Sequence, residues 1–275
     1  MKALWKNAVQ QRDLIALAIV LCLVLLACDE ARPIKIGFVG GMTGRVADLG
    51  IAGRDGVIFA IEEKNQAGGI AGRMLELVVR DDQQDNDRAK QAVGELLEED
   101  VLAIIGPMTS SMAVVIKPVI DAGKTVTVSP TVKTDQLSAQ DDYFLRVTVP
   151  LSSNARLLAG QVVDNLDLHK VAVVYDVSNR AFTETWVNYF AAALQEQGGE
   201  VIVTEEFTSS SLVHFMPIAQ RIMSSSAEAV LLLSNAIDTA LLAQQFNKLG
   251  SRMPLFSSEW AFTTDLISFG GRAVD

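Results

Sequence analysis

A short cluster of hydroxyl side chains, Thr109 to Ser111, is the part of the sequence best suited to holding a ligand. It follows the apolar run 101–105, so the pattern predicts a strand that leads into a helix beginning near Ser110. The first turn of a helix offers free N–H groups and a partial positive charge, which suit a bound carboxylate. The simpler alternative is that Ser110 or Ser111 only caps the helix. We expect the cap, together with contact to an acidic ligand group.

Few residues are suited to catalysis. His169 and His214 are the only histidines, and both are expected at solvated positions beside helix or strand ends. The sequence has no Gly-x-Ser-x-Gly nucleophile elbow, no paired-histidine metal motif and no phosphate-binding glycine loop. Asp81 and Asp82 could bind a cation, although adjacent carboxylates after a strand are more often solvated or capping groups. The sequence therefore predicts a binding protein that is not an enzyme and uses no metal or cofactor.

Composition narrows the class of protein. The 275 residues are 49% hydrophobic and 20% charged, which is typical of a globular chain. The formal net charge of −10, without a basic stripe, argues against nucleic acid as a partner. The only cysteines are Cys22 and Cys28, so the chain after residue 28 is expected to have no disulfide and no thiol chemistry.

The N-terminal residues predict export. Three basic residues within the first twelve precede the apolar run Leu14–Ala27. That run is shorter than the roughly 20 residues of a transmembrane helix and has the length of a signal-peptide core. Cys28 follows at once, and the junction resembles the lipobox of bacterial lipoproteins, although Leu26 stands where a small residue is usual. We expect a signal peptide over 1–27, a lipid on Cys28 and a linker over 28–33; the alternative is an ordinary signal peptide with an incidental cysteine.

Short apolar runs alternate with longer amphipathic ones along the rest of the chain. The runs 101–105, 171–175 and 229–233 are apolar without alternation, as in parallel strands buried on both faces. Repeated βα units of this kind predict an α/β protein with doubly wound parallel sheets. The alternation restarts after Pro150, so we expect an N-terminal lobe over 34–150 and a C-terminal lobe over 151–275. Strands are expected at 34–39, 75–79, 101–105, 125–129, 171–175, 201–207, 229–233 and 255–257, and helices at 49–66, 85–100, 110–122, 152–166, 181–197, 215–224 and 238–249.

The loops after these strands are the expected place for a ligand, because ligands of open parallel sheets bind beyond the carboxyl ends of the strands. They are rich in Ser, Thr, Gly and Asn and poor in titratable groups, which suits hydrogen-bonded capture of a small polar molecule. Trp260 lies in one of them and is either a stacking contact for a ligand or a core residue. The loops cover 40–48, 81–85, 106–111, 130–136, 176–180, 234–237 and 257–260.

Several short motifs, taken in order and spacing, resemble the branched-chain amino-acid-binding family of type I periplasmic binding proteins. The resemblance extends over essentially all of the chain after the lipobox. It implies two Rossmann-like lobes that are joined by crossing strands and close on a ligand. The motifs are Ile34–Gly37, Met42–Gly44, Asn65–Gly72, Asp81-Asp82, Ile104–Gly106, Ser129-Pro130, Phe144–Val147, Val173–Asp176, Gln244–Phe246 with Gly250, and Ser258-Glu259.

The same resemblance assigns roles at the two poles of an amino-acid ligand. It places the carboxylate-binding serine on Ser110, beside Ser111, and the backbone carbonyl that accepts the ligand ammonium on Thr131. It places the acidic partner of the ammonium on Glu259. The threonine that contacts both poles falls on Lys133, or on Thr134 after a shift of one residue.

Three aromatic contacts of the type member fall on Leu49, Arg180 and Asn235 in this sequence. These differences, together with the positive charge of Lys133, argue against a plain leucine or valine ligand. They favour a ligand with an additional carboxylate or amide, and proteins of this family also bind amides, urea and aromatic acids.

The resemblance further implies a solute-binding lipoprotein on the extracytoplasmic face of the membrane that delivers its ligand to the permease of an ABC importer. Two alternatives stay open: a sensory receptor domain of the same fold that acts on a signalling partner, and a non-functional remnant. The family continues well beyond the position that corresponds to Asp275, so we expect the C-terminal lobe to be incomplete and the chain to be truncated.

Overall fold

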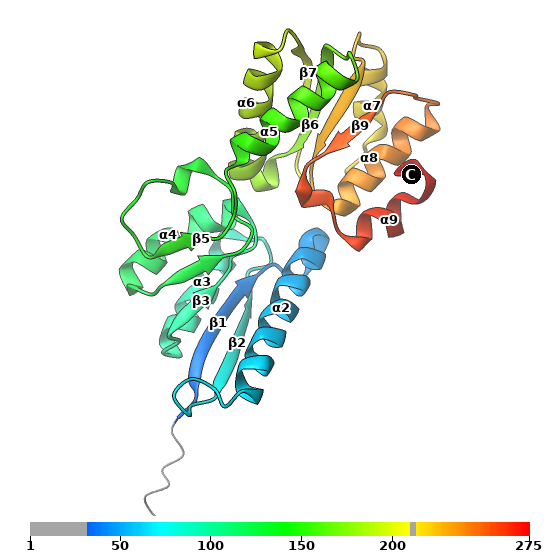
Figure 1. Ribbon diagram of the computed structural model, residues 1–275. Helices are drawn as coiled ribbons and strands as arrows, with labels where there is room; N and C mark the ends of the chain where they lie inside the picture. The colour runs from blue at the N-terminus through cyan, green and yellow to red at the C-terminus, as the bar shows by residue number, and fades with distance from the viewer. Residues whose placement is uncertain (1–31, 210–212) are drawn as a thin grey trace, which may run out of the picture.

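The computed structural model describes residues 32–209 and 213–275, and these form two α/β lobes, each built on one parallel sheet (Figure 1). We call the part from β1 (Ile34–Gly40) to β5 (Phe144–Arg146) the first lobe, and the part from β6 (Lys170–Asp176) to β9 (Leu255–Ser257) the second lobe. The predicted signal peptide and the predicted lipid site at Cys28 lie outside the described residues. Within the two described stretches, no helix combines the length and apolar character required to cross a bilayer.

The first lobe has a five-stranded sheet in the order β2-β1-β3-β4-β5, in which all neighbours are parallel. Helices α3 and α4 cover one face through a core that includes Leu96, Ile104 and Ile116. The elements are β1 (Ile34–Gly40), α2 (Ala47–Gln66), β2 (Leu75–Asp81), α3 (Asn86–Glu98), β3 (Ala103–Ile105), α4 (Ser110–Gly123), β4 (Thr127–Ser129) and β5 (Phe144–Arg146), with 3-10 turns η1 (Gly44–Val46) and η2 (Asp135–Leu137).

The second lobe has a four-stranded parallel sheet in the order β7-β6-β8-β9. Its helices are α5 (Leu151–Gly160), α6 (Arg180–Glu196), α7 (Met216–Met223), α8 (Ala236–Lys248) and α9 (Thr264–Gly270). A π-helical turn, Gln161–Asn165, extends α5. The strands are β6 (Lys170–Asp176), β7 (Glu200–Phe207), β8 (Ala229–Leu233) and β9 (Leu255–Ser257), and the 3-10 turns are η4 (Val177–Asn179), η5 (Glu259–Ala261) and η6 (Gly271–Ala273).

Strand β6 shows why its sequence is apolar without alternation. Val171 and Val173 belong to the core beneath α5 and α6, whereas Ala172 and Val174 belong to the core on the α7 and α8 side. All four side chains are fully buried. A strand covered by helices on both faces has no solvated side on which to place polar residues, so the prediction of doubly wound parallel sheets is confirmed.

The predicted strands and helices match the observed ones to within a few residues at their ends, but the predicted ranges do not include α9, and the structure also differs at the crossing between the lobes. There the structure adds β5, which pairs in parallel with β4, before residues 147–150 lead into α5. A three-residue strand is too short to produce a recognisable hydrophobic period. The crossing places the carboxyl ends of both sheets so that they face each other across the gap between the lobes (Figure 1).

Candidate functional site

A cavity of about 270 Å³ lies between the lobes, where loops from the carboxyl ends of both sheets meet. The position agrees with the general rule for open parallel sheets. Its apolar wall consists of Leu49, Met108, Pro130, Val149, Phe182 and Trp260, and its polar wall of Thr109, Ser110, Thr131, Lys133, Thr148, Asn179 and Glu259.

The N-terminus of α4 forms the first-lobe side of this cavity. Thr109 is the N-cap residue, but its hydroxyl donates to Gln84 Oε1 at 2.9 Å and makes no cap bond. Ser110 Oγ accepts the N–H of Lys133 at 3.1 Å. The expectation that Ser110 or Ser111 caps its own helix is therefore wrong, because both hydroxyls are used by other segments.

The cap of α4 comes instead from the second lobe. Asn179, at the end of η4, accepts the backbone N–H of Ser111 through Oδ1 at 3.0 Å. In return, the N–H of Ala181 donates to Ser111 Oγ at 3.2 Å. This reciprocal contact ties the first turns of α4 and α6 across the cleft. It satisfies one of the first-turn N–H groups of α4 that would otherwise need a partner.

The loop after β4 is held against α4 by buried hydrogen bonds. Ser129 Oγ donates to Pro107 O at 2.8 Å and accepts the N–H of Val132 at 3.2 Å. Thr131 Oγ1 donates to Met108 O at 2.6 Å. The loop geometry thereby places both Thr131 and Lys133 on the cavity wall.

Lys133 and Glu259 form an ion pair across the cavity. Lys133 Nζ lies 2.6 Å from Glu259 Oε1, although 126 residues separate the two in sequence. Asn154 Nδ2, from α5, donates to the same oxygen at 3.2 Å. The lysine side chain is 12% exposed and that of the glutamate 35% exposed, so the pair is partly shielded from water.

The apolar wall is completed by two aromatic rings of the second lobe. Phe182, from the first turn of α6, and Trp260, from η5, meet edge to face with centroids 5.9 Å apart. Leu49 approaches from α2 of the first lobe. Trp260 is thus a core residue that also lines the cavity, and its stacking on a ligand stays a prediction.

The predicted ligand residues divide into two groups in the structure. Leu49, Ser110, Thr131, Lys133 and Glu259 all line the cavity. The other four predicted residues do not line it: Ser111, Thr134, Arg180 and Asn235.

Each of these four has a different role. Ser111 joins the lobes as described above. Thr134 is fully buried and its hydroxyl caps η2 through the N–H of Gln136. Arg180 lies on the exposed side of α6, where it pairs with Glu184 and Glu206. A single residue step along α6 turns the side chain about 100° around the helix axis, which separates outward Arg180 from buried Ala181 and Phe182.

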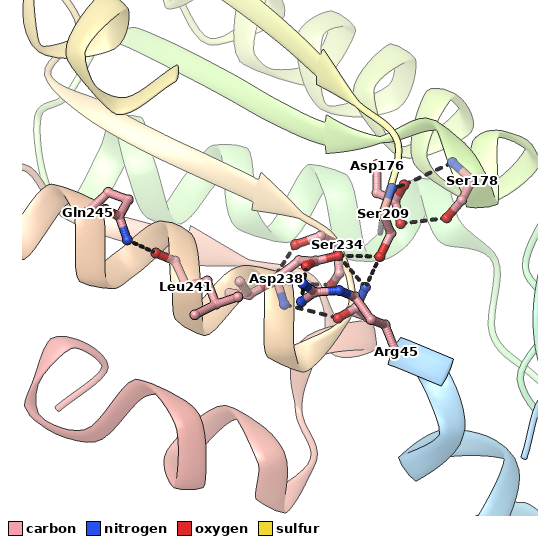
Figure 2. A network of polar contacts seen from close by, with 10 residues as sticks. Arg45, Asp176, Ser178, Ser209, Ser234, Asp238, Leu241 and Gln245 are labelled. Atoms are coloured by element: carbon pink, nitrogen blue, oxygen red, sulfur yellow. Dashed lines mark hydrogen bonds and ion pairs between the residues drawn. The ribbon is translucent and has the colours of Figure 1, made fainter. Parts of the chain in front are cut away.

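Asn235 contacts Asp238, which together with Arg45 and Ser209 forms a second cluster of polar contacts (Figure 2). It caps α8 by accepting the N–H of Asp238 at 3.0 Å, and its Nδ2 donates to Asp238 Oδ2 at 2.7 Å. Arg45 from the first lobe reaches the other oxygen of Asp238 at 2.8 Å. The Ser209 hydroxyl also contacts Asp238, whose pKa is raised by burial, an effect that Arg45 opposes.

The acidic pair Asp81-Asp82, at the end of β2, accepts hydrogen bonds from the neighbouring loops. Asp81 Oδ1 accepts the N–H of Met42 at 2.8 Å, and Oδ2 accepts the hydroxyl of Thr43 at 2.9 Å. Asp82 Oδ1 accepts both the N–H and the side-chain amide of Gln84. Burial raises the pKa of Asp82 to about 6, and Gln84 links this carboxyl to Thr109 on the cavity wall. The described residues contain no group of three or more His, Cys, Asp or Glu side chains placed to hold a metal ion.

Several cavity residues were not predicted individually from the sequence: Met108, Thr148, Val149, Asn179 and Phe182. Met108 and Asn179 fall within loops expected to face a ligand, but nothing marks them among the other residues of those loops. Phe182 lies in a helix, and its place on the wall follows from the approach of α6 to α4.

The periplasmic binding protein family model matches residues 33–275. A Leu/Ile/Val-binding protein homologue of Brucella melitensis is 26% identical over 86% of this chain, and the match covers 64% of the relative. The chain therefore spans less than two thirds of the length of this curated relative. The matched family consists of substrate-binding proteins and not of enzymes.

Two solved structures have the same fold. A leucine-binding protein of Thermotoga maritima superposes with a TM-score of 0.81 at 27% identity, over 88% of this chain and 68% of that one. The branched-chain amino-acid transporter substrate-binding protein of Streptococcus pneumoniae, in complex with isoleucine, gives a TM-score of 0.78 at 23% identity, over 87% of this chain and 68% of that one.

Proposed function

Because the chain belongs to the periplasmic binding protein family, we propose that it captures a small carboxylate- or amide-bearing solute between its lobes and delivers it to an ABC importer. The observation that carries the proposal is the cavity at the N-terminus of α4, enclosed by residues of both lobes. Backbone N–H groups and the Ser110 hydroxyl offer hydrogen bonds to a carboxylate there. The apolar rings opposite them would cover the remainder of the ligand.

The importer would recognise the form of the protein in which the two lobes are closed around the ligand. Hinge closure around a ligand is a common transition in two-lobed proteins. Four contacts join the lobes in the structure: Ser111 with Asn179, Lys133 with Glu259, Asp48 with Thr263 and Arg45 with Asp238. A ligand that favours this arrangement over an open one shifts the population toward it. The closed form would then present both lobes together to the permease.

The proposal includes export and anchoring. The basic start, the apolar run 14–27 and Cys28 support a signal peptide whose cysteine carries lipid. A lipid at that position would hold the binding lobes at the extracytoplasmic face of the membrane, close to the importer. The family to which the chain belongs is itself extracytoplasmic, which is consistent with this placement.

Thermal melting of the purified full chain against amino acids, amides and carboxylic acids tests the proposal. A ligand at 100 times its dissociation constant stabilises the folded state by about 2.7 kcal/mol. For a body of this size the midpoint rises by about 5–11 °C. Absence of any rise across the panel, in a chain shown by circular dichroism to be folded, contradicts a solute-binding function. Co-purification of the liganded chain with the importer permease tests the delivery step.

A further inference from the structure

We propose that the Lys133 ammonium occupies the place beside Glu259 that a ligand ammonium would take, so that the cavity selects carboxylic acids without an α-amino group. The inference rests on the proposed function, because it names the class of solute for the same cavity. It also replaces the sequence-based expectation of an amino-acid ligand, since the two residues assigned to the ligand are bound to each other.

The two charged side chains of the cavity wall, Lys133 and Glu259, neutralise each other. Lys133 and Glu259 are the only ionisable side chains among the described residues that line it. Their Nζ to Oε1 distance is 2.6 Å, and Asn154 supplies a second donor to the same oxygen. No carboxylate on the wall is left to neutralise an incoming ammonium. The first turn of α4 adds a partial positive charge, so the cavity suits a ligand with one negative charge.

A zwitterionic amino acid is unfavourable in this cavity, because Lys133 already neutralises Glu259. Its ammonium would have to displace Lys133 from Glu259, which would leave two cations near one carboxylate. Like charges in a partly desolvated site repel strongly and are a common means of rejecting a ligand. The Lys133 backbone is held by its N–H bond to Ser110 Oγ, so the loop cannot swing away without breaking that contact. A carboxylic acid requires no such rearrangement.

An acidic amino acid is the competing ligand, because its second carboxylate could pair with Lys133 and its ammonium with Glu259. The apolar wall argues against it. The side chains of Leu49, Met108, Val149 and Phe182 supply hydrocarbon or ring surface and no hydrogen-bond donor, and Trp260 adds a largely apolar ring. Burying a second charge against such surface is unfavourable. The same surface suits the aliphatic or aromatic body of a monocarboxylic acid, and a cavity of about 270 Å³ accommodates a small one.

Matched pairs of ligands test the inference. We would measure calorimetric binding of 3-phenylpropanoate against phenylalanine and of 4-methylpentanoate against leucine, with glutamate as the competing class, on the purified full chain. Each pair differs only in the α-amino group. The inference predicts that the acid binds at least about tenfold more tightly than its amino-acid partner, a difference of about 1.4 kcal/mol.

The outcomes distinguish a failure of this inference from a failure of the proposed solute-binding function. If an amino acid binds as tightly as its matched acid, or if the thermal panel yields only ligands without a carboxylate, the inference is overturned while solute binding stands. If no compound of the panel binds the folded chain, both fail.

Removal of the two wall charges by substitution tests the inference independently. Lys133→Met leaves Glu259 unpaired, so affinity for the carboxylic acid should fall about tenfold or more and the preference should move toward the amino acid. The double variant Lys133→Met with Glu259→Gln removes both charges and should restore carboxylic-acid binding toward that of the parent chain. If the double variant binds no better than Lys133→Met, the charge argument is overturned, because a purely structural role of Lys133 would not be rescued.

Discussion

Arg45 Nη1 lies 2.8 Å from Asp238 Oδ1, so a guanidinium of the first lobe is held by a carboxylate that is fully buried in the second (Figure 2). The other oxygen of Asp238 accepts from Asn235. Opening the lobes would leave this carboxylate without its counter-charge. The pair therefore favours the closed arrangement of the lobes.

Replacement of Arg45 should shift the protein toward an open form. Arg45→Met removes a charge-assisted hydrogen bond worth about 1.5–3 kcal/mol, so we expect weaker ligand binding and a larger radius of gyration in small-angle X-ray scattering. Arg54→Met is the matched control, because among the described residues Arg54 pairs with its neighbour Asp55 on α2 and with no residue of the second lobe. If Arg45→Met and Arg54→Met behave alike, the pair does not govern closure.

Ser110 should be required for ligand binding. In Ser110→Ala the ligand carboxylate loses a hydroxyl donor, and the N–H of Lys133 loses its acceptor. A hydrogen bond to a charged group contributes about 1.5–3 kcal/mol, so calorimetry should show affinity lower by about 10- to 150-fold. Ser153→Ala, at an exposed position on α5, provides the control and should bind normally. Unchanged affinity in Ser110→Ala would mean that the carboxylate lies elsewhere.

Gly50 should be intolerant of a side chain. A Cβ at this position would lie 1.8 Å from the carbonyl oxygen of Gly41, so α2 and the loop after β1 would have to separate. We expect Gly50→Ala to lower stability by about 1–3 kcal/mol in urea unfolding. Gly56→Ala, on the same helix with open space around it, should instead stabilise by about 0.5–1 kcal/mol. Equal effects of the two substitutions would contradict the close approach.

Stability should rise as the pH falls through the raised pKa of Asp82. Burial raises that pKa from 3.8 to about 6, so the folded state holds a proton that the unfolded state has already lost between these values. The contribution of the Asp82 carboxyl to the free energy of unfolding is therefore greatest below pH 3.8. It declines by up to about 3 kcal/mol as the pH rises through 6. Buried Asp176 and Asp238, whose pKa values are also raised, act in the same direction.

Asp82→Asn tests this dependence. The amide keeps an oxygen to accept from Gln84 but cannot ionise, so the slope of unfolding free energy between pH 4 and pH 7 should become shallower. Asp87→Asn, at an exposed position on α3, should leave the slope unchanged. An identical slope in Asp82→Asn and the parent chain would show that this carboxyl does not titrate in the expected range.

Cys28 should carry the membrane anchor. Expressed in a bacterial host with radiolabelled palmitate, the full chain should incorporate label and sediment with the membrane fraction. Cys28→Ser should lose the label, whereas Cys22→Ser, inside the apolar run, should retain it. Labelling that persists in Cys28→Ser would contradict the lipobox interpretation.

Local patterns were sufficient for the fold and for most of the loops that line the cavity, whereas most individual site residues were assigned from the family resemblance. Uninterrupted apolar runs such as Ala229–Leu233 predict strands buried on both faces, and β8 is buried along its whole length. Ligands of parallel sheets bind at the carboxyl ends of the strands. The same patterns therefore predict that the loops after the strands face a ligand, and these loops include Ser110, Thr131 and Glu259, which line the cavity.

The tertiary structure decided which side chains meet. Asn179 caps a helix of the opposite lobe, and Lys133 neutralises a glutamate 126 residues away. Neither contact can be recognised from the spacing of residues along the sequence, because each depends on how the two lobes pack across the cleft. The sequence by itself therefore determined the βα architecture and the edge of the sheets at which the cavity lies. The packing of one lobe against the other determined the charge balance of the cavity, and with it the class of solute that we expect it to hold.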